Sequence, residues 1–119
     1  MSPAPSAHLQ SFKAEFFKAL AHPIRIRILE VLRAGERSVQ ELQTRLEVDQ
    51  STVSQQLAVL RAKSIVTARK EGTTVRYEIR DRLVGDLLDV ARRIFNNQLA
   101  GTQTMLRALR QEARRPTRR

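Results

Sequence analysis

The period of the hydrophobic pattern changes twice along this 119-residue chain. Between residues 8 and 63 the apolar side chains recur every three or four positions, which predicts helices. Between residues 65 and 79 they alternate with polar side chains, which predicts strands, and from residue 81 the helical period returns. A β-hairpin set among helices in a chain of this length predicts one domain of mostly α fold.

Start and stop signals divide the part before the hairpin into four helices. Pro23 suits the first turn of a helix, and Gly35 suits the residue after one. Ser38-Val39-Gln40-Glu41 has the pattern of a capping box, and Asp49 is a favourable N-cap. The predicted helices span residues 8–20, 23–34, 39–46 and 50–63.

The short break between the last two of these helices is typical of a helix-turn-helix, whose second helix enters the major groove of DNA. On a helical wheel, Val53, Leu57 and Leu60 face the core. The opposite side is short, polar and uncharged, and amides and hydroxyls can bond base edges there. The alternative is an ordinary exposed helix rich in Gln and Ser. The predicted DNA contacts of this helix are Gln50, Ser51, Thr52, Ser54, Gln55, Gln56 and Arg61.

Two strands, Ile65–Arg69 and Thr73–Ile79, are predicted on either side of a turn at Lys70-Glu71-Gly72, where glycine supplies a positive φ. Basic side chains gather near this turn, as expected of a wing that lies along phosphates or in the minor groove. The alternative is a solvated turn with incidental charge. The predicted DNA contacts of the wing are Arg69, Lys70, Thr73 and Arg76.

The chain carries 22 Lys and Arg residues against 12 Asp and Glu residues, a net charge of +10. A charge of that sign favours polyanionic partners. Double-stranded DNA is the partner that the helix-turn-helix indicates, and a basic RNA- or ribosome-associated protein is the alternative. RNA readers usually stack bases on exposed aromatic rings, whereas the one tyrosine, Tyr77, is predicted on the apolar face of its strand.

Residues 16–80 resemble the winged helix-turn-helix regulators of the ArsR family. The matching segments are FFKALAHPIRIRILEVL, SVQELQTRLEVDQSTVSQQLAVLRAKSIV and ARKEGTTVRYEIRD. The resemblance implies a homodimer that binds imperfect palindromes near promoters and is often released by an effector. It also implies that residues 50–63 read the groove and that residues 69–76 form the wing.

Three departures from the family pattern bear on the effector. Many members sense metals through cysteines, and this chain has none. Others use an Asp/His set on the last helix, where this chain offers only Asp86 and Asp89, a poor transition-metal site without imidazole. Ser64 stands where the family commonly has Gly, which predicts strain if that residue needs a positive φ. His22, before Pro23, is expected to cap or pack.

The first and last predicted helices carry more apolar residues than a domain of roughly 60 residues can bury. We predict that these helices form a dimer interface, which would place two groove-reading helices roughly 34 Å apart. The alternative is that the same residues close a monomeric core. The predicted interface comprises Leu9, Phe12, Phe16, Leu83, Leu87, Ile94, Phe95 and Leu99.

These patterns together predict a sequence-specific DNA-binding transcriptional regulator that acts as a homodimer on a palindromic operator, with repression the favoured direction. We expect a disordered N-terminus over residues 1–7, a winged helix-turn-helix domain with its dimerisation helices over 8–112, and a basic disordered tail over 113–119. The sequence leaves open the operator, the target genes and the effector.

Other classes of protein are not favoured. No catalytic triad or phosphate-binding glycine loop is visible in the sequence, so we predict no enzyme activity. Without cysteines there is no disulfide or thiolate metal site, and we expect neither a cofactor nor a metal. The N-terminus lacks the features of a signal peptide, and no apolar run approaches the roughly 18 residues of a membrane span. We therefore expect a cytoplasmic protein.

Overall fold

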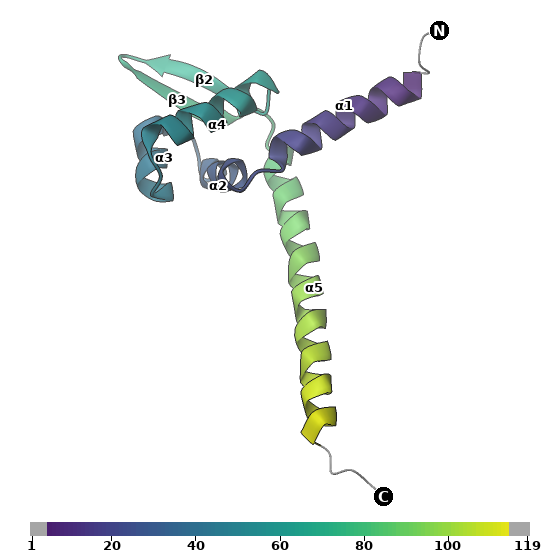
Figure 1. Ribbon diagram of the computed structural model, residues 1–119. Coiled ribbons are helices and arrows are strands. Elements are labelled where there is room, and N and C mark those ends of the chain that lie inside the picture. Colours follow the sequence, from purple (N-terminus) through teal and green to yellow (C-terminus); the bar gives the residue numbers. More distant parts are fainter. Residues whose placement is uncertain (1–4, 115–119) are drawn as a thin grey trace, which may run out of the picture. The chain divides into compact units, whose positions relative to one another are not determined.

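The computed structural model describes residues 5–114 (Figure 1), so the disorder predicted for residues 1–4 and 115–119 falls outside the described residues. The neighbouring residues 5–7 and 113–114 belong to helices. The chain divides into two compact units, of which the first ends at Gly85 and the second begins at Asp86. In chain order the elements are α1 (Pro5–Leu20), α2 (Pro23–Leu32), β1 (Arg37–Ser38), α3 (Val39–Leu46), α4 (Gln50–Ala62), β2 (Val66–Glu71), β3 (Thr74–Ile79) and α5 (Leu83–Arg114).

This order confirms the mostly helical fold class with a β-hairpin wing. Helix α3 has the predicted bounds, and α4 ends one residue earlier than the pattern predicts. Helix α2 ends at Leu32 and not at Ala34, because the chain turns before Gly35, which has φ +141°. The periodicity thus places each helix of this unit to within about three residues, which is typical of boundaries read from sequence.

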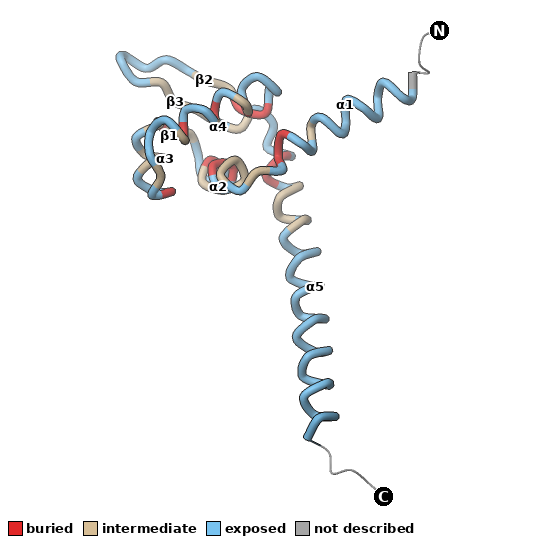
Figure 2. The backbone as a smooth tube through the Cα atoms, in the orientation of Figure 1, coloured by how far each residue is buried: buried red, intermediate tan, exposed pale blue. Residues whose placement is uncertain are grey.

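Apolar side chains of α2, α3 and α4 form the core of the first unit. Figure 2 marks buried stretches on α2 and α4 and at the C-terminal end of α1. Val53, Leu57 and Leu60 are at most 1% exposed, which confirms the core-facing side of the helical wheel. Burying one such side chain stabilises a fold by roughly 1.5–3 kcal/mol. The other buried apolar residues are Ala19, Leu20, Ile28, Leu29, Leu32, Leu42, Leu46, Ile65, Val66 and Val84.

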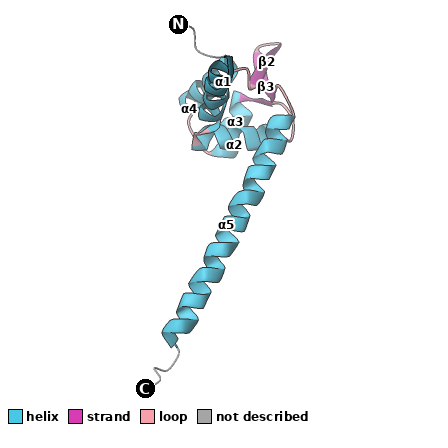
Figure 3. Cartoon of the chain, turned by 90° about the vertical axis from the view of Figure 1, so that its right-hand side faces the viewer, coloured by secondary structure: helices cyan, strands magenta, loops and turns pink. Residues whose placement is uncertain are grey.

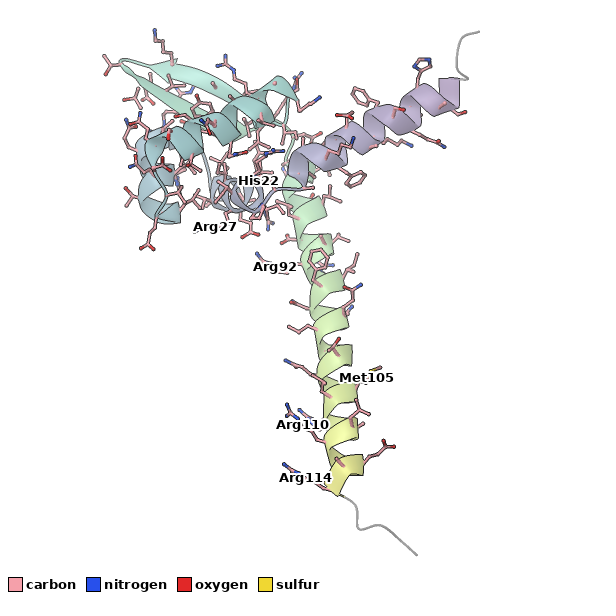
Figure 4. All side chains as sticks on the ribbon, viewed as in Figure 1. His22, Arg27, Arg92, Met105, Arg110 and Arg114 are labelled. Atoms are coloured by element: carbon pink, nitrogen blue, oxygen red, sulfur yellow. The ribbon has the colours of Figure 1, made fainter. Side chains whose placement is uncertain are left out.

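Side chains satisfy the backbone at the ends of the short helices. The Ser38 hydroxyl accepts the Glu41 N–H, and the Glu41 carboxylate accepts the Ser38 N–H, both at 3.2 Å. These two bonds confirm the predicted capping box at the start of α3. His22 Nδ1 accepts the Ile24 N–H at 3.1 Å, which confirms a capping role at the start of α2. Arg27 donates to the carbonyl of Leu46 at 2.8 Å and so closes the end of α3. The side chains of His22 and Arg27 are labelled in Figure 4.

Strands β1, β3 and β2 form an antiparallel sheet in that spatial order, and Figure 3 shows β2 and β3 as a hairpin. The hydrophobic pattern does not predict β1, because two residues carry no readable period. Strand β2 continues to Glu71, since the turn consists of Gly72 and Thr73 alone. Gly72 has φ +63°, the left-handed conformation that two-residue hairpin turns need. The predicted turn at residues 70–72 therefore begins two residues too early and ends one residue too early.

Residue Ser64, after α4, has φ +58°. The ArsR pattern commonly has Gly at this position, and the structure shows that the positive φ considered for it is adopted. For a residue with a Cβ the conformation costs roughly 1–2 kcal/mol. It is retained because it lets the Ile65 N–H reach the Leu60 carbonyl at 3.0 Å as the chain leaves the helix for the sheet.

Helix α5 is continuous over 32 residues, so the helical period that returns from residue 81 runs on through Met105 without a break. Figure 2 shows it exposed along most of its length, and only Val84 and Gly85 are buried. Helix α1 is buried at Ala19 and Leu20 near its end. No helix among the described residues combines the length and hydropathy needed to cross a membrane. The large apolar side chains that remain exposed on the two helices are Leu9, Phe12, Phe17, Leu83, Val90, Ile94, Phe95, Leu99, Met105, Leu106 and Leu109.

Candidate nucleic-acid interface

The outward side of α4 is exposed and uncharged along its first two turns. Ser51, Ser54 and Gln55 are exposed there, as are Ala58 and Arg61 farther along. A Gln amide both donates and accepts hydrogen bonds, and a hydroxyl can do either. The helix therefore presents a thin layer of hydrogen-bonding groups, followed by a small side chain that allows close approach to a partner surface.

Asp49 orders the first hydroxyls of this face. It stands at the N-cap position of α4, but its side chain makes no bond to the helix backbone, which differs from the capping role the sequence predicts. Instead its carboxylate accepts the Ser51 hydroxyl at 2.6 Å and also the Thr52 hydroxyl. The hydrogen bond from Ser51 has the largest effect and that from Thr52 the next largest, and together they hold the pKa of Asp49 below its ordinary value. Both hydroxyl hydrogens are thus committed, and their oxygen lone pairs remain for a ligand.

Gln56 lies apart from the other polar residues of α4. Its Oε1 accepts a hydrogen bond from Arg25 Nε at 2.8 Å in a partly buried position. Arg25 also donates to the Ala19 carbonyl at 3.0 Å, so the pair ties α4 to α2 and to the end of α1. The helical wheel groups Gln56 with the groove-facing residues because it considers α4 alone, and the partner Arg25 lies 31 positions away in the sequence.

A hollow of about 450 Å³ opens beside the exposed face of α4. Its lining residues are Ser54, Ala58, Arg61, Ala62 and Tyr77. Two hydroxyls and a guanidinium can donate hydrogen bonds there to an oxygen-rich or anionic group. The strand pattern assigns Tyr77 to the apolar face and so misses its place beside α4. Ala58 and Ala62 of α4 line the same hollow.

The hairpin register divides the wing residues between two faces of the sheet. Lys70 is paired with Val75 and shares a face with Tyr77, because side chains alternate along a strand. Arg69 is paired with Arg76 on the other face. The basic side chains that the sequence groups around one tip therefore point in two directions.

Carboxylates engage both arginines of the second face. Glu36 Oε1 accepts a hydrogen bond from Arg69 and lies 3.3 Å from Arg76 Nε. Glu41 Oε1 lies 3.2 Å from Arg76 Nη2, and Glu71 Oε2 lies 3.3 Å from Arg69 Nη2. The hydrogen bond from Arg69 holds the pKa of Glu36 below its ordinary value, so this carboxylate is charged at neutral pH. No local pattern in the sequence points to Glu36, which precedes Arg69 by 33 positions.

Two of the predicted wing contacts have free side chains. Within the described part of the chain, neither Lys70 nor Thr73 makes a side-chain hydrogen bond or an ion pair, and both are exposed. The described residues also contain no group of three His, Asp or Glu side chains that could hold a metal ion.

The chain is similar in sequence to known bacterial transcriptional regulators. Residues 22–68 match the model of the family described as bacterial regulatory protein, arsR family. The chain is 44% identical over 106 residues to an HTH-type transcriptional regulator of Mycobacterium tuberculosis, Rv0081, and the match covers 88% of this chain and 93% of that protein. It is 39% identical over 82 residues to the biofilm growth-associated repressor of Agrobacterium fabrum, covering 69% and 70% of the two chains.

Solved structures of similar proteins share the fold of this chain. The crystal structure of Rv0081 superposes with a TM-score of 0.74, covering 84% of this chain and 98% of that chain. A solution structure of Mb0332 from Mycobacterium bovis, a homodimeric winged helix-turn-helix DNA-binding domain, also superposes with a TM-score of 0.74. It is 32% identical, and the match covers 82% and 91% of the two chains.

Proposed function

Since this chain belongs to the arsR family of bacterial regulatory proteins, we propose that it acts as a homodimeric repressor on a palindromic operator. It is a DNA-binding transcriptional regulator and not an enzyme. We propose in addition that the regulator is a homodimer, that it represses, and that specific residues of α4 and the wing contact DNA. The Agrobacterium relative is named a repressor, which supports repression here.

The reading surface in this proposal is the outward side of α4. Gln55 offers an amide that can bond an adenine edge with two hydrogen bonds. Ser51 and Thr52 donate their hydroxyl hydrogens to Asp49, so they would accept hydrogen bonds from base amino groups. Gln50 and Ser54 complete the face. The observation that carries the proposal is this uncharged, exposed face standing directly above the buried Val53, Leu57 and Leu60.

The phosphate contacts in this proposal flank the reading surface. Lys70 and Thr73 would meet the DNA backbone from the wing, since both side chains are free and exposed. Arg61 and Tyr77 would hold the backbone segment that enters the hollow beside α4. We assign Gln56 to positioning α4, because its Oε1 already accepts a hydrogen bond from Arg25.

The dimer is supported by the apolar faces of α1 and α5. Phe12 is 75% exposed, Phe95 63% and Met105 66%, and exposed apolar surface of that extent marks an interaction site. A second copy would cover it with the same side chains. Mb0332 is described as homodimeric. Two copies related by a two-fold axis read two half-sites of a palindrome.

Selection of bound sequences from a random duplex library tests the proposal. We expect enrichment of a two-fold symmetric site with half-sites about one helical turn apart. Adding divalent metals in a parallel selection tests for an effector of that class, and structured RNA as competitor tests the alternative partner. Recovery of an asymmetric site, or equal competition by RNA, would contradict the proposal.

A further inference from the structure

The pairing of Arg69 with Arg76 across the hairpin needs an explanation. Like charges directly opposite each other on neighbouring strands destabilise a sheet. Here two guanidinium groups face three carboxylates, those of Glu36, Glu41 and Glu71. Each arginine thus has carboxylate partners within the protein, which offset the repulsion between the two guanidinium groups.

Arg76 joins three separate elements through this cluster. It lies on β3 opposite Ser38 of β1, and its guanidinium reaches Glu36 in the loop before β1 and Glu41 in α3 at 3.3 and 3.2 Å. Glu41 also closes the capping box that starts α3. The side chain of Arg76 is only 25% exposed. One side chain thus connects the wing to the helix that precedes α4.

We propose that Arg76, held by Glu36 and Glu41, is a positioning residue that fixes the wing relative to the helix-turn-helix and does not itself contact phosphate. This inference rests on the proposed function, because it concerns how the wing and α4 engage one duplex together. It separates the wing into a contacting face with Lys70 and a bracing face with Arg76.

The physical basis is the rigidity of a planar guanidinium that is bonded on more than one edge. Arg presents several N–H groups in a fixed fork, so simultaneous ion pairs with two carboxylates restrict its orientation. The strand that carries it then keeps one angle to α3. A phosphate that took over the guanidinium would break its ion pairs with Glu36 and Glu41. Glu36 would keep Arg69 and Glu41 would keep the Ser38 N–H, but the link between the wing and α3 would be lost.

The sign of the effect of Glu36→Gln tests the inference. The full-length chain and its variants are titrated with the selected operator and with a random duplex at several salt concentrations. If Arg76 positions the wing, Glu36→Gln weakens operator binding by roughly tenfold and leaves the salt slope unchanged. If Arg76 contacts phosphate, the same variant releases it, so that binding to both duplexes tightens and the salt slope steepens even in an Arg69→Ala background, which removes the other arginine that Glu36 holds; that result would overturn the inference.

Glu78→Gln is the matched control, because it removes a negative charge from the same face of β3. Glu78 is exposed and makes no ion pair or hydrogen bond through its side chain within residues 5–114. It therefore measures the general effect of one fewer carboxylate near DNA. A Glu36→Gln variant that binds operator as tightly as Glu78→Gln would also overturn the inference.

Arg76→Lys serves if Glu36→Gln does not fold, as judged by its thermal unfolding. Lys keeps the charge and loses the fork. We expect about tenfold weaker operator binding with an unchanged salt slope, whereas retained operator binding would contradict the inference. The wild-type titration separates a failure of the proposed function from a failure of the bracing role of Arg76. A wild-type chain without operator preference refutes the proposed function, and a wild-type preference with unaffected variants refutes only the bracing role.

Discussion

Helix α4 exposes one face to solvent and helix α5 is exposed along most of its length, and the chemistry of the two exposed surfaces differs. The face of α4 carries Ser51 and Gln55 and is uncharged. The face of α5 carries Phe95 and Met105, which are 63% and 66% exposed. Water satisfies hydroxyls and amides, whereas it solvates large apolar side chains poorly. A polar face can therefore stay hydrated without a partner, whereas burial against another surface is favourable for an apolar face of this extent.

Figure 4 adds a second contrast within α5. Arg92, Arg110 and Arg114 project from one side of this helix and Met105 from another. The helix is therefore amphipathic, with an apolar side that suits a second copy and a basic side that stays hydrated. We infer that α5 serves assembly and α4 serves recognition. Substitutions on each helix test these two roles separately.

The largest effect is expected from a charge placed on the apolar face of α5. Phe95→Glu would remove two buried phenyl rings from a symmetric dimer, each contributing roughly 1.5–3 kcal/mol. We expect the dimer dissociation constant to rise by about 100-fold or more, as measured by sedimentation equilibrium. Asn96→Glu, one position along on the hydrated side, is the control. Equal dissociation constants for the two variants would mean that this face does not join two copies.

The next largest effect concerns the polar face of α4. Gln55→Ala would remove a two-bond contact to a base, worth roughly 1–3 kcal/mol of discrimination. The ratio of operator to random-duplex affinity should fall by about 5- to 150-fold, while random-duplex binding is retained. Titration by fluorescence anisotropy measures both, with Gln103→Ala on α5 as control. An unchanged ratio would show that this face does not read the bases.

A smaller, sequence-independent effect is expected at the wing. Lys70→Ala should weaken binding to every duplex alike and lower the salt slope by about 0.9, the value for one phosphate contact. Titrations between low and moderate salt give the slope. Lys13→Ala on α1 removes the same charge away from the wing, and a similar loss of slope there would refute a specific contact by Lys70.

The smallest effect lies at the end of α4, outside both faces. Ser64→Gly should raise the free energy of unfolding by up to about 1 kcal/mol, because glycine adopts the left-handed conformation without steric cost. Chemical denaturation measures it, and Ser64→Ala, which keeps the Cβ, should give no such gain. Operator affinity should stay unchanged. A change in affinity would mean that the strained residue takes part in recognition.

Much of the fold could be predicted because its signals are local. The capping box joins Ser38 to Glu41 within one turn, and a period of 3.6 places Leu57 and Leu60 on the same side of α4. The positive φ of Ser64 has no such local signal, because only the Gly of the ArsR pattern at this position raised the possibility. The two-residue strand β1 has no such signal, since pairing with β3 alone defines it.

The sequence by itself determined the order of the helices and of the hairpin, the core-facing side of α4 and the polar residues of its outer side, because each depends on residues within a few positions of one another. Only the tertiary structure decided which of those polar groups are free. Gln56 is engaged by Arg25, 31 positions earlier, and Arg76 by Glu36, 40 positions earlier. Hydrogen bonds and ion pairs act over a few ångströms, and only folding brings such distant residues within that range.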